Sequence, residues 1–257
     1  MPWATAGVGA SLVLIGSVML RELILRRAGR NLRVRTAAVG TPSAGHQRSE
    51  TSGPEKLTLE RNAAILGEIQ KKSDAANVLN RLSAGHREVF ELCSEYMSLN
   101  ENELKSVNPG SPRLPALLKG RSAVADFHRY HLLKWAQIEV QTLTADALKQ
   151  DDPENKKKSA KAALTVIDTA LRSYPSEESL VESQDLLKEM VVSISVSDRV
   201  ERAERAAFEG DYAVAKEMYR DALFYLGRDN IQSEARARAA ERINEELEQI
   251  RQVENGR

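Results

Sequence analysis

The sequence predicts an all-α protein with an N-terminal single transmembrane helix, a linker, and a body of antiparallel helical hairpins. Aromatic residues make up only 5% of the 257 residues, and glycines are few, as is typical of helical proteins. Apolar residues in the body recur three or four positions apart, which is the period of an α-helix. The stretch from Trp3 to Leu20 carries no charged residue.

That uncharged stretch is predicted to be a membrane anchor. As a helix it would be roughly 27 Å long, close to the ~30 Å hydrocarbon core of a bilayer. Six arginines follow between residues 21 and 35, offset only by Glu22, whereas a cleaved secretory signal carries its positive charges before the apolar run. A buried core helix is the other alternative, and the dense cationic flank argues against it.

The same arginines predict the topology of the chain. Because basic residues favour the cytoplasmic side of a membrane, we expect the anchor over 1–35 to leave the body in the cytoplasm. The expected location is an inner (plasma) membrane. The alternative is the mitochondrial outer membrane, with the body facing the cytosol.

Charge is unevenly distributed along the chain, although the formal net charge is zero. Residues 1–50 hold seven of the 37 basic and two of the 37 acidic residues, which leaves 30 basic against 35 acidic residues in the rest. A mildly acidic body disfavours nucleic acid as a partner, because phosphate binding needs an electropositive surface. The single cysteine, Cys93, excludes an intrachain disulfide and agrees with a reducing cytoplasm.

A flexible linker is predicted over 36–55, where glycine, proline and serine occur without a periodic apolar pattern. Ser52–Glu55 has the spacing of a capping box for the helix that follows. Residues 56–107 are expected to form one long helix or a helix pair, depending on whether Ser83–His86 breaks them. Asn108–Pro112 ends this part, because two prolines and a glycine cannot continue a helix.

Further helices are predicted between residues 113 and 257. The segment Val191–Ser197 alternates apolar residues with serine, which alone would suggest a strand. Val192, Val196 and Val200 nevertheless share one helical face, so we expect a helix there. The predicted helices cover 114–149, 156–173, 176–209, 212–226 and 231–252.

The stretch Ala206–Leu223 carries a Gly-Asp-Tyr turn at residues 210–212, between two helical segments. It resembles a tetratricopeptide repeat, in which such a turn joins paired helices. The small and aromatic positions of the second helix are matched by Ala215, Tyr219 and Ala222. A weaker copy is offset by 52 residues, rather than the ~34 of the regular repeat, and consists of Ala163, Ile167, Ala170 and Pro175.

The resemblance covers about residues 140–250 and implies tetratricopeptide-like packing for the hairpins of 113–257. A microtubule-interacting-and-transport domain uses a similar turn and is the alternative. We expect Ala215 and Ala222 to face a partner helix with Tyr219 between them, and Lys216 to lie on the opposite face. Family members that grip C-terminal carboxylates present Lys and Asn where this chain has Val200 and Glu204, so no carboxylate clamp is implied.

No catalytic, cofactor-binding or metal-binding residues are predicted. His128 and His131 have a spacing that could place two imidazoles on one helical face, but no cluster of further ligands completes a metal site. Cys93 lies on an apolar face and is expected in the core. The sequence has no phosphate-binding glycine loop, nucleophile elbow or zinc motif, so we expect no enzyme and no cofactor.

The best candidate for a partner-binding surface is a basic, aromatic-rich stretch between residues 119 and 135. It could bind phosphate groups or an acidic partner, and a solvated helix face is the alternative. Its candidate residues are Arg121, Arg129, Tyr130, Lys134 and Trp135. The function predicted is a membrane-anchored helical-repeat scaffold or adaptor that binds another protein. The alternative is a structural or assembly protein that self-associates through a coiled coil beginning near Pro54.

Overall fold

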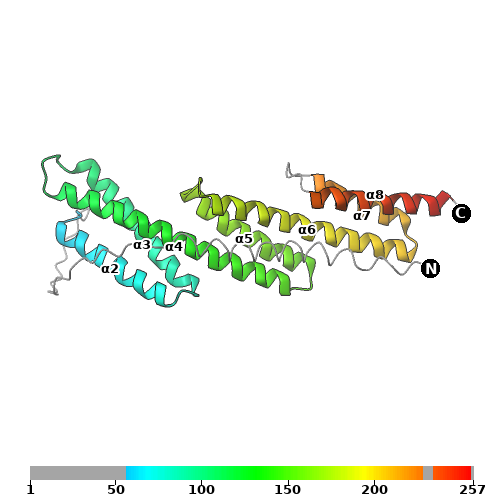
Figure 1. Cartoon of the computed structure of the whole chain (residues 1–257), viewed down its shortest axis with the longest axis horizontal. Helices are drawn as coiled ribbons and strands as arrows, with labels where there is room; N and C mark the ends of the chain where they lie inside the picture. The colour runs from blue at the N-terminus through cyan, green and yellow to red at the C-terminus, as the bar shows by residue number, and fades with distance from the viewer. Residues whose placement is uncertain (1–55, 228–233, 256–257) are drawn as a thin grey trace. The chain divides into compact units, whose positions relative to one another are not determined.

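The computed structural model describes residues 56–227 and 234–255 of the chain (Figure 1). Every regular element in these two ranges is an α-helix, which confirms the all-α prediction. The seven helices are α2 (Leu59–Val78), α3 (Ser83–Ser106), α4 (Arg113–Lys149), α5 (Pro153–Ser173), α6 (Glu178–Glu209), α7 (Tyr212–Gly227) and α8 (Glu234–Asn255).

The transmembrane part of the predicted fold class is wrong for the described residues. None of α2 to α8 is both long and apolar enough to cross a bilayer. The reason is amphipathicity: each helix carries charged residues through its length and buries only one face. The predicted anchor (1–35) and the predicted linker (36–55) lie outside the described residues.

Helix boundaries differ from the prediction where the capping residue was missed. The stretch 56–107 is a helix pair, α2 and α3, because the chain turns at residues 79–82. Thr58 caps α2 by accepting a hydrogen bond from the Arg61 N–H at 3.2 Å, whereas the predicted capping box at Ser52–Glu55 lies outside the described residues. Asp152 caps α5, so this helix begins at Pro153 within the predicted loop.

The described chain divides into two compact units, and the division falls inside α4, between Glu139 and Val140. We call residues 56–139 the N-terminal bundle. We call residues 140–227 and 234–255 the C-terminal hairpins.

The N-terminal bundle consists of α2, α3 and the first part of α4. Its core is apolar, with Ile69, Val89 and Val124 fully buried. Buried polar groups also join the helices. The Tyr96 hydroxyl donates to Asn62 Oδ1 at 2.7 Å, and the Asn100 side-chain amide donates to the Leu117 carbonyl at 3.0 Å. This bundle therefore depends on matched hydrogen bonds as well as on apolar packing.

The C-terminal hairpins pack consecutive helices against one another. Gly210 ends α6 in the left-handed conformation, with φ of 83°, and the side chain of Asp211 accepts the Val214 N–H at 3.2 Å to start α7. Val191–Ser197 lies inside α6, so the helix expected there is confirmed. The core of α6, α7 and α8 consists of Val192, Val196, Ala203, Ala206, Ala215, Tyr219, Ala222, Ile243, Leu247 and Ile250.

The predicted inner face of α7 is found as expected, whereas its outer face is not. Ala215, Tyr219 and Ala222 are buried against α6 and α8. Lys216, however, is not a free surface residue, because its Nζ lies 2.8 Å from Glu254 Oε2 on α8. The prediction considered only the helix pair, and α8 covers a second side of α7.

Candidate functional site

The structure separates the five residues of the predicted partner-binding stretch. Arg121 and Arg129 are exposed on α4. Trp135 is buried, with its ring 5.2 Å from that of Phe90 on α3. Tyr130 is partly buried and donates its hydroxyl to Asn77 Oδ1 on α2 at 2.9 Å.

Lys134 is also partly buried, and its Nζ lies 3.4 Å from Gln137 Oε1 on the same helix. The aromatic members of this stretch therefore contribute to packing within the bundle. They do not form one exposed surface with the two arginines. Binding of a partner at these residues stays a prediction, and the two exposed arginines are the members that solvent reaches.

A chain of hydrogen-bonded side chains crosses the interior of the N-terminal bundle. His131 Nε2 on α4 lies 2.9 Å from Ser73 Oγ on α2, and His131 Nδ1 lies 2.8 Å from His86 Nδ1 on α3. All three side chains are almost completely buried. We call His86 and His131 the buried histidine pair. A third imidazole, that of His128, lies 2.9 Å from Ser94 Oγ through Nε2.

A serine hydrogen-bonded to an imidazole that is held by a further group is the arrangement of a nucleophile and its base. Here the arrangement is closed to a substrate, because Ser73, His131 and His86 lie in the core of three packed helices. Burial, and next the charge of His86, lowers the pKa of His131 to about 4. Such an imidazole is a weak base at neutral pH, so the geometry points to a structural role.

His128 and His131, which were considered as metal ligands, contact different side chains. His128 contacts Ser94 and His131 contacts His86, and no group of three His, Cys, Asp or Glu side chains suited to a metal occurs in the described ranges. Cys93 is fully buried, and burial raises the pKa of its thiol to about 12. This thiol is therefore protonated and inaccessible, as expected of a core residue.

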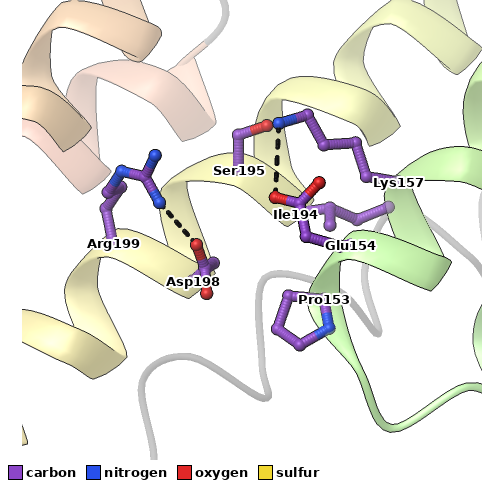
Figure 2. Close-up of a pocket in the computed structure, with 7 residues that line it drawn as sticks. All are labelled: Pro153, Glu154, Lys157, Ile194, Ser195, Asp198 and Arg199. Carbon is purple, nitrogen blue, oxygen red and sulfur yellow. Dashed lines mark hydrogen bonds and ion pairs between the residues drawn. The ribbon is translucent and has the colours of Figure 1, made fainter.

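A narrow crevice lies between α5 and α6 in the C-terminal hairpins (Figure 2). The carboxylate of Asp198 accepts hydrogen bonds from Arg199 at 2.6 Å and from Arg202 at 2.9 Å. The crevice is too narrow to admit a water molecule, so its charged side chains pair with one another and leave no space for a small ligand. Its lining residues are Pro153, Glu154, Lys157, Ile194, Ser195, Asp198 and Arg199.

Two large aromatic side chains stand on the surface of the α6–α7 hairpin. Phe208 is 94% exposed in the last turn of α6, and Phe224 is 66% exposed on α7. The sequence has only four phenylalanines, so half of them are exposed on this hairpin. The pattern of the sequence contained this signal, because Phe224 lies off the helical face defined by Ala215, Tyr219 and Ala222.

The buried histidine pair was not predicted, because His86 and His131 are 45 residues apart and no local pattern links them. Comparison with known proteins adds no further assignment: no family of proteins, no curated protein and no solved structure matches this chain.

Proposed function

We propose that this chain is a scaffold or adaptor that binds another protein through its C-terminal hairpins. The observation that carries the proposal is the exposure of Phe208 and Phe224 on a hairpin whose core is otherwise closely packed. An aromatic side chain is less favourable in water than when it is buried against a partner. Aromatic residues are accordingly enriched at protein interfaces. Stacked helical hairpins present extended surfaces that bind without chemistry.

The test is affinity purification of the tagged full-length chain from its native cells, with quantitative identification of the co-purifying proteins. In the Phe208→Ser/Phe224→Ser variant we expect binding of a defined partner to fall about tenfold or more, because interface aromatics often contribute more than about 1.4 kcal/mol each. Both side chains are exposed, so folding stability should change by less than about 0.5 kcal/mol per site.

The matched control is Glu209→Ala/Arg220→Ala, which alters two exposed polar residues of the same hairpin. This control should retain the partner. Equal recovery of the same proteins by wild type and by the phenylalanine variant would contradict the proposal, as would the absence of any enriched protein.

Self-association remains the second hypothesis, but the apolar residues of α2 that it needs pack inside the N-terminal bundle. The helix expected to form the coiled coil is α2, and two residues of its apolar stripe, Ile69 and Ala76, are buried within the N-terminal bundle. Self-association through this stripe would require α2 to leave the bundle and expose that core. Binding through the C-terminal hairpins requires no such opening.

A further inference from the structure

The buried histidine pair connects all three helices of the N-terminal bundle. His86 extends from α3, His131 from α4, and Ser73 from α2, and the two contacts measure 2.8 and 2.9 Å. His86 Nε2 is buried and has no hydrogen-bond partner in the described chain. This one ring nitrogen without a partner decides how protons are arranged in the chain of side chains.

A neutral imidazole carries one proton, so only one of the two facing Nδ1 atoms can donate. If His131 donated, His86 would carry its proton on Nε2 and bury an unpaired N–H group. If His86 donates, its Nε2 holds only a lone pair, and His131 Nε2–H donates to Ser73 Oγ. A buried unpaired donor is the rarer and costlier case, so the geometry favours His86 as donor.

An additional proton has no favourable position in this arrangement. On His86 Nε2 it would create a buried N–H without an acceptor, and on His131 Nδ1 it would bring two N–H groups face to face and break the contact between the rings. The groups that contact or act on the two rings are Ser73 from α2 and Phe127, Tyr130 and Lys134 from α4. None of these is a carboxylate that could stabilise an imidazolium.

We propose that the buried histidine pair is an acid-sensitive lock, which holds α2, α3 and α4 together while both rings are neutral and opens the N-terminal bundle when they are protonated. The proposal rests on the burial, the two contacts and the unpaired nitrogen, and it does not depend on the proposed partner binding.

The direction of the pH effect follows from where protons bind. Burial lowers the pKa of both His86 and His131, that of His131 to about 4, whereas an unfolded histidine has a pKa near 6.5. The unfolded state therefore binds more protons between about pH 6.5 and pH 4. Stability is complete above this window and falls as the pH drops through it. For His131 alone, the folding equilibrium constant should fall about 20-fold between pH 7 and pH 5.

The experiment is urea unfolding of the full chain at pH 7 and pH 5, followed by tryptophan fluorescence. The chain has two tryptophans, Trp3 and Trp135, so a Trp3→Phe background leaves only the reporter within the N-terminal bundle. We expect the urea midpoint to fall at pH 5, and we expect this fall to be much smaller in the His86→Leu/His131→Leu variant, in which His128 still has a pKa lowered by burial. Replacing both histidines by leucine removes both rings, so neither imidazole is left buried without the other as its hydrogen-bond partner.

The matched control is His128→Asn, because burial also lowers the pKa of His128. This variant should keep most of the shift between pH 7 and pH 5, because the buried histidine pair is unchanged. The lock is overturned if the double variant keeps that shift, or if the parent chain shows none. Nitrogen-15 NMR of the histidines in the unaltered chain is independent of how the variants fold. We expect His86 as the Nδ1–H tautomer at pH 7, with a pKa lowered by burial, and titration of His86 near pH 6.5 would overturn the proposal.

Discussion

Gly120 lies where α4 closely approaches the side chains of α2 and α3. A Cβ atom at this position of α4 would lie 2.2 Å from the Tyr96 hydroxyl and 3.4 Å from Asn62 Oδ1. Glycine inside a helix is about 1 kcal/mol less favourable than alanine, so close approach of the helices accounts for its presence. Only a residue without a side chain lets Tyr96 donate to Asn62 at this crossing.

We therefore predict that Gly120→Ala destabilises the bundle by about 1–3 kcal/mol, as overpacked core positions do, despite the better helix propensity of alanine. Fluorescence of Trp135 during urea unfolding, in the Trp3→Phe background, measures the change. Gly67→Ala on α2 is the control, because no atom lies within 4 Å of its added Cβ, and this variant should gain up to about 1 kcal/mol. If both variants raise the free energy of unfolding by the same amount, the close approach of Tyr96 to Gly120 is contradicted.

The residues in contact across the bundle could not be predicted from sequence patterns. Helical spacing places Tyr96 and His86 on an apolar face, and it correctly assigns Cys93 to the core. The partners Asn62, Gly120 and His131 belong to other helices, and the sequence has no local signal for such pairs. The same is true of Trp135, whose aromatic ring was taken for a binding residue and is buried against Phe90.

At the scale of elements, periodicity predicted the helices well and their first turns less well. Val191–Ser197 was assigned to a helix because its flanks and one face were helical, and this is confirmed. Residues 153–155, which precede the helix predicted at 156–173, belong instead to α5, since proline is well tolerated in the first turn and Asp152 supplies the cap. Proline and aspartate occur both in turns that end a helix and in the first turn of the next helix. The sequence pattern alone therefore does not show at which residue a helix begins.

The packing of α7 against α6 and α8 gives a prediction at this scale. Tyr219→Ala should leave a cavity and cost about 3–5 kcal/mol, and Ala222→Leu should overpack the contact at about 1–3 kcal/mol. Glu217→Ala is the suitable control, since Glu217 is exposed and Lys216 is paired with Glu254. Thermal unfolding followed by circular dichroism measures all three variants. A loss in Glu217→Ala as large as that in Tyr219→Ala would show that the inner face is misassigned.

At the scale of the molecule, the division into two units was not predictable from turn signals. The sequence places its breaks at proline and glycine clusters, such as Asn108–Pro112, whereas the units divide within the continuous helix α4. A helix is continuous in its own hydrogen bonds even where its buried face passes from one core to another. Each unit has its own core, that of Ile69 and Val89 in the bundle and that of Tyr219 and Ile243 in the hairpins.

Separate cores predict that destabilisation stays within one unit, because cooperative opening follows contiguous packing. Hydrogen exchange of the full chain tests this with the two variants above. Gly120→Ala should accelerate exchange in α2 and α3 and leave α6 and α7 at the wild-type rate, whereas Tyr219→Ala should do the reverse. Equal acceleration in both units by either variant would mean that the two cores unfold as one, with α4 transmitting the loss between them.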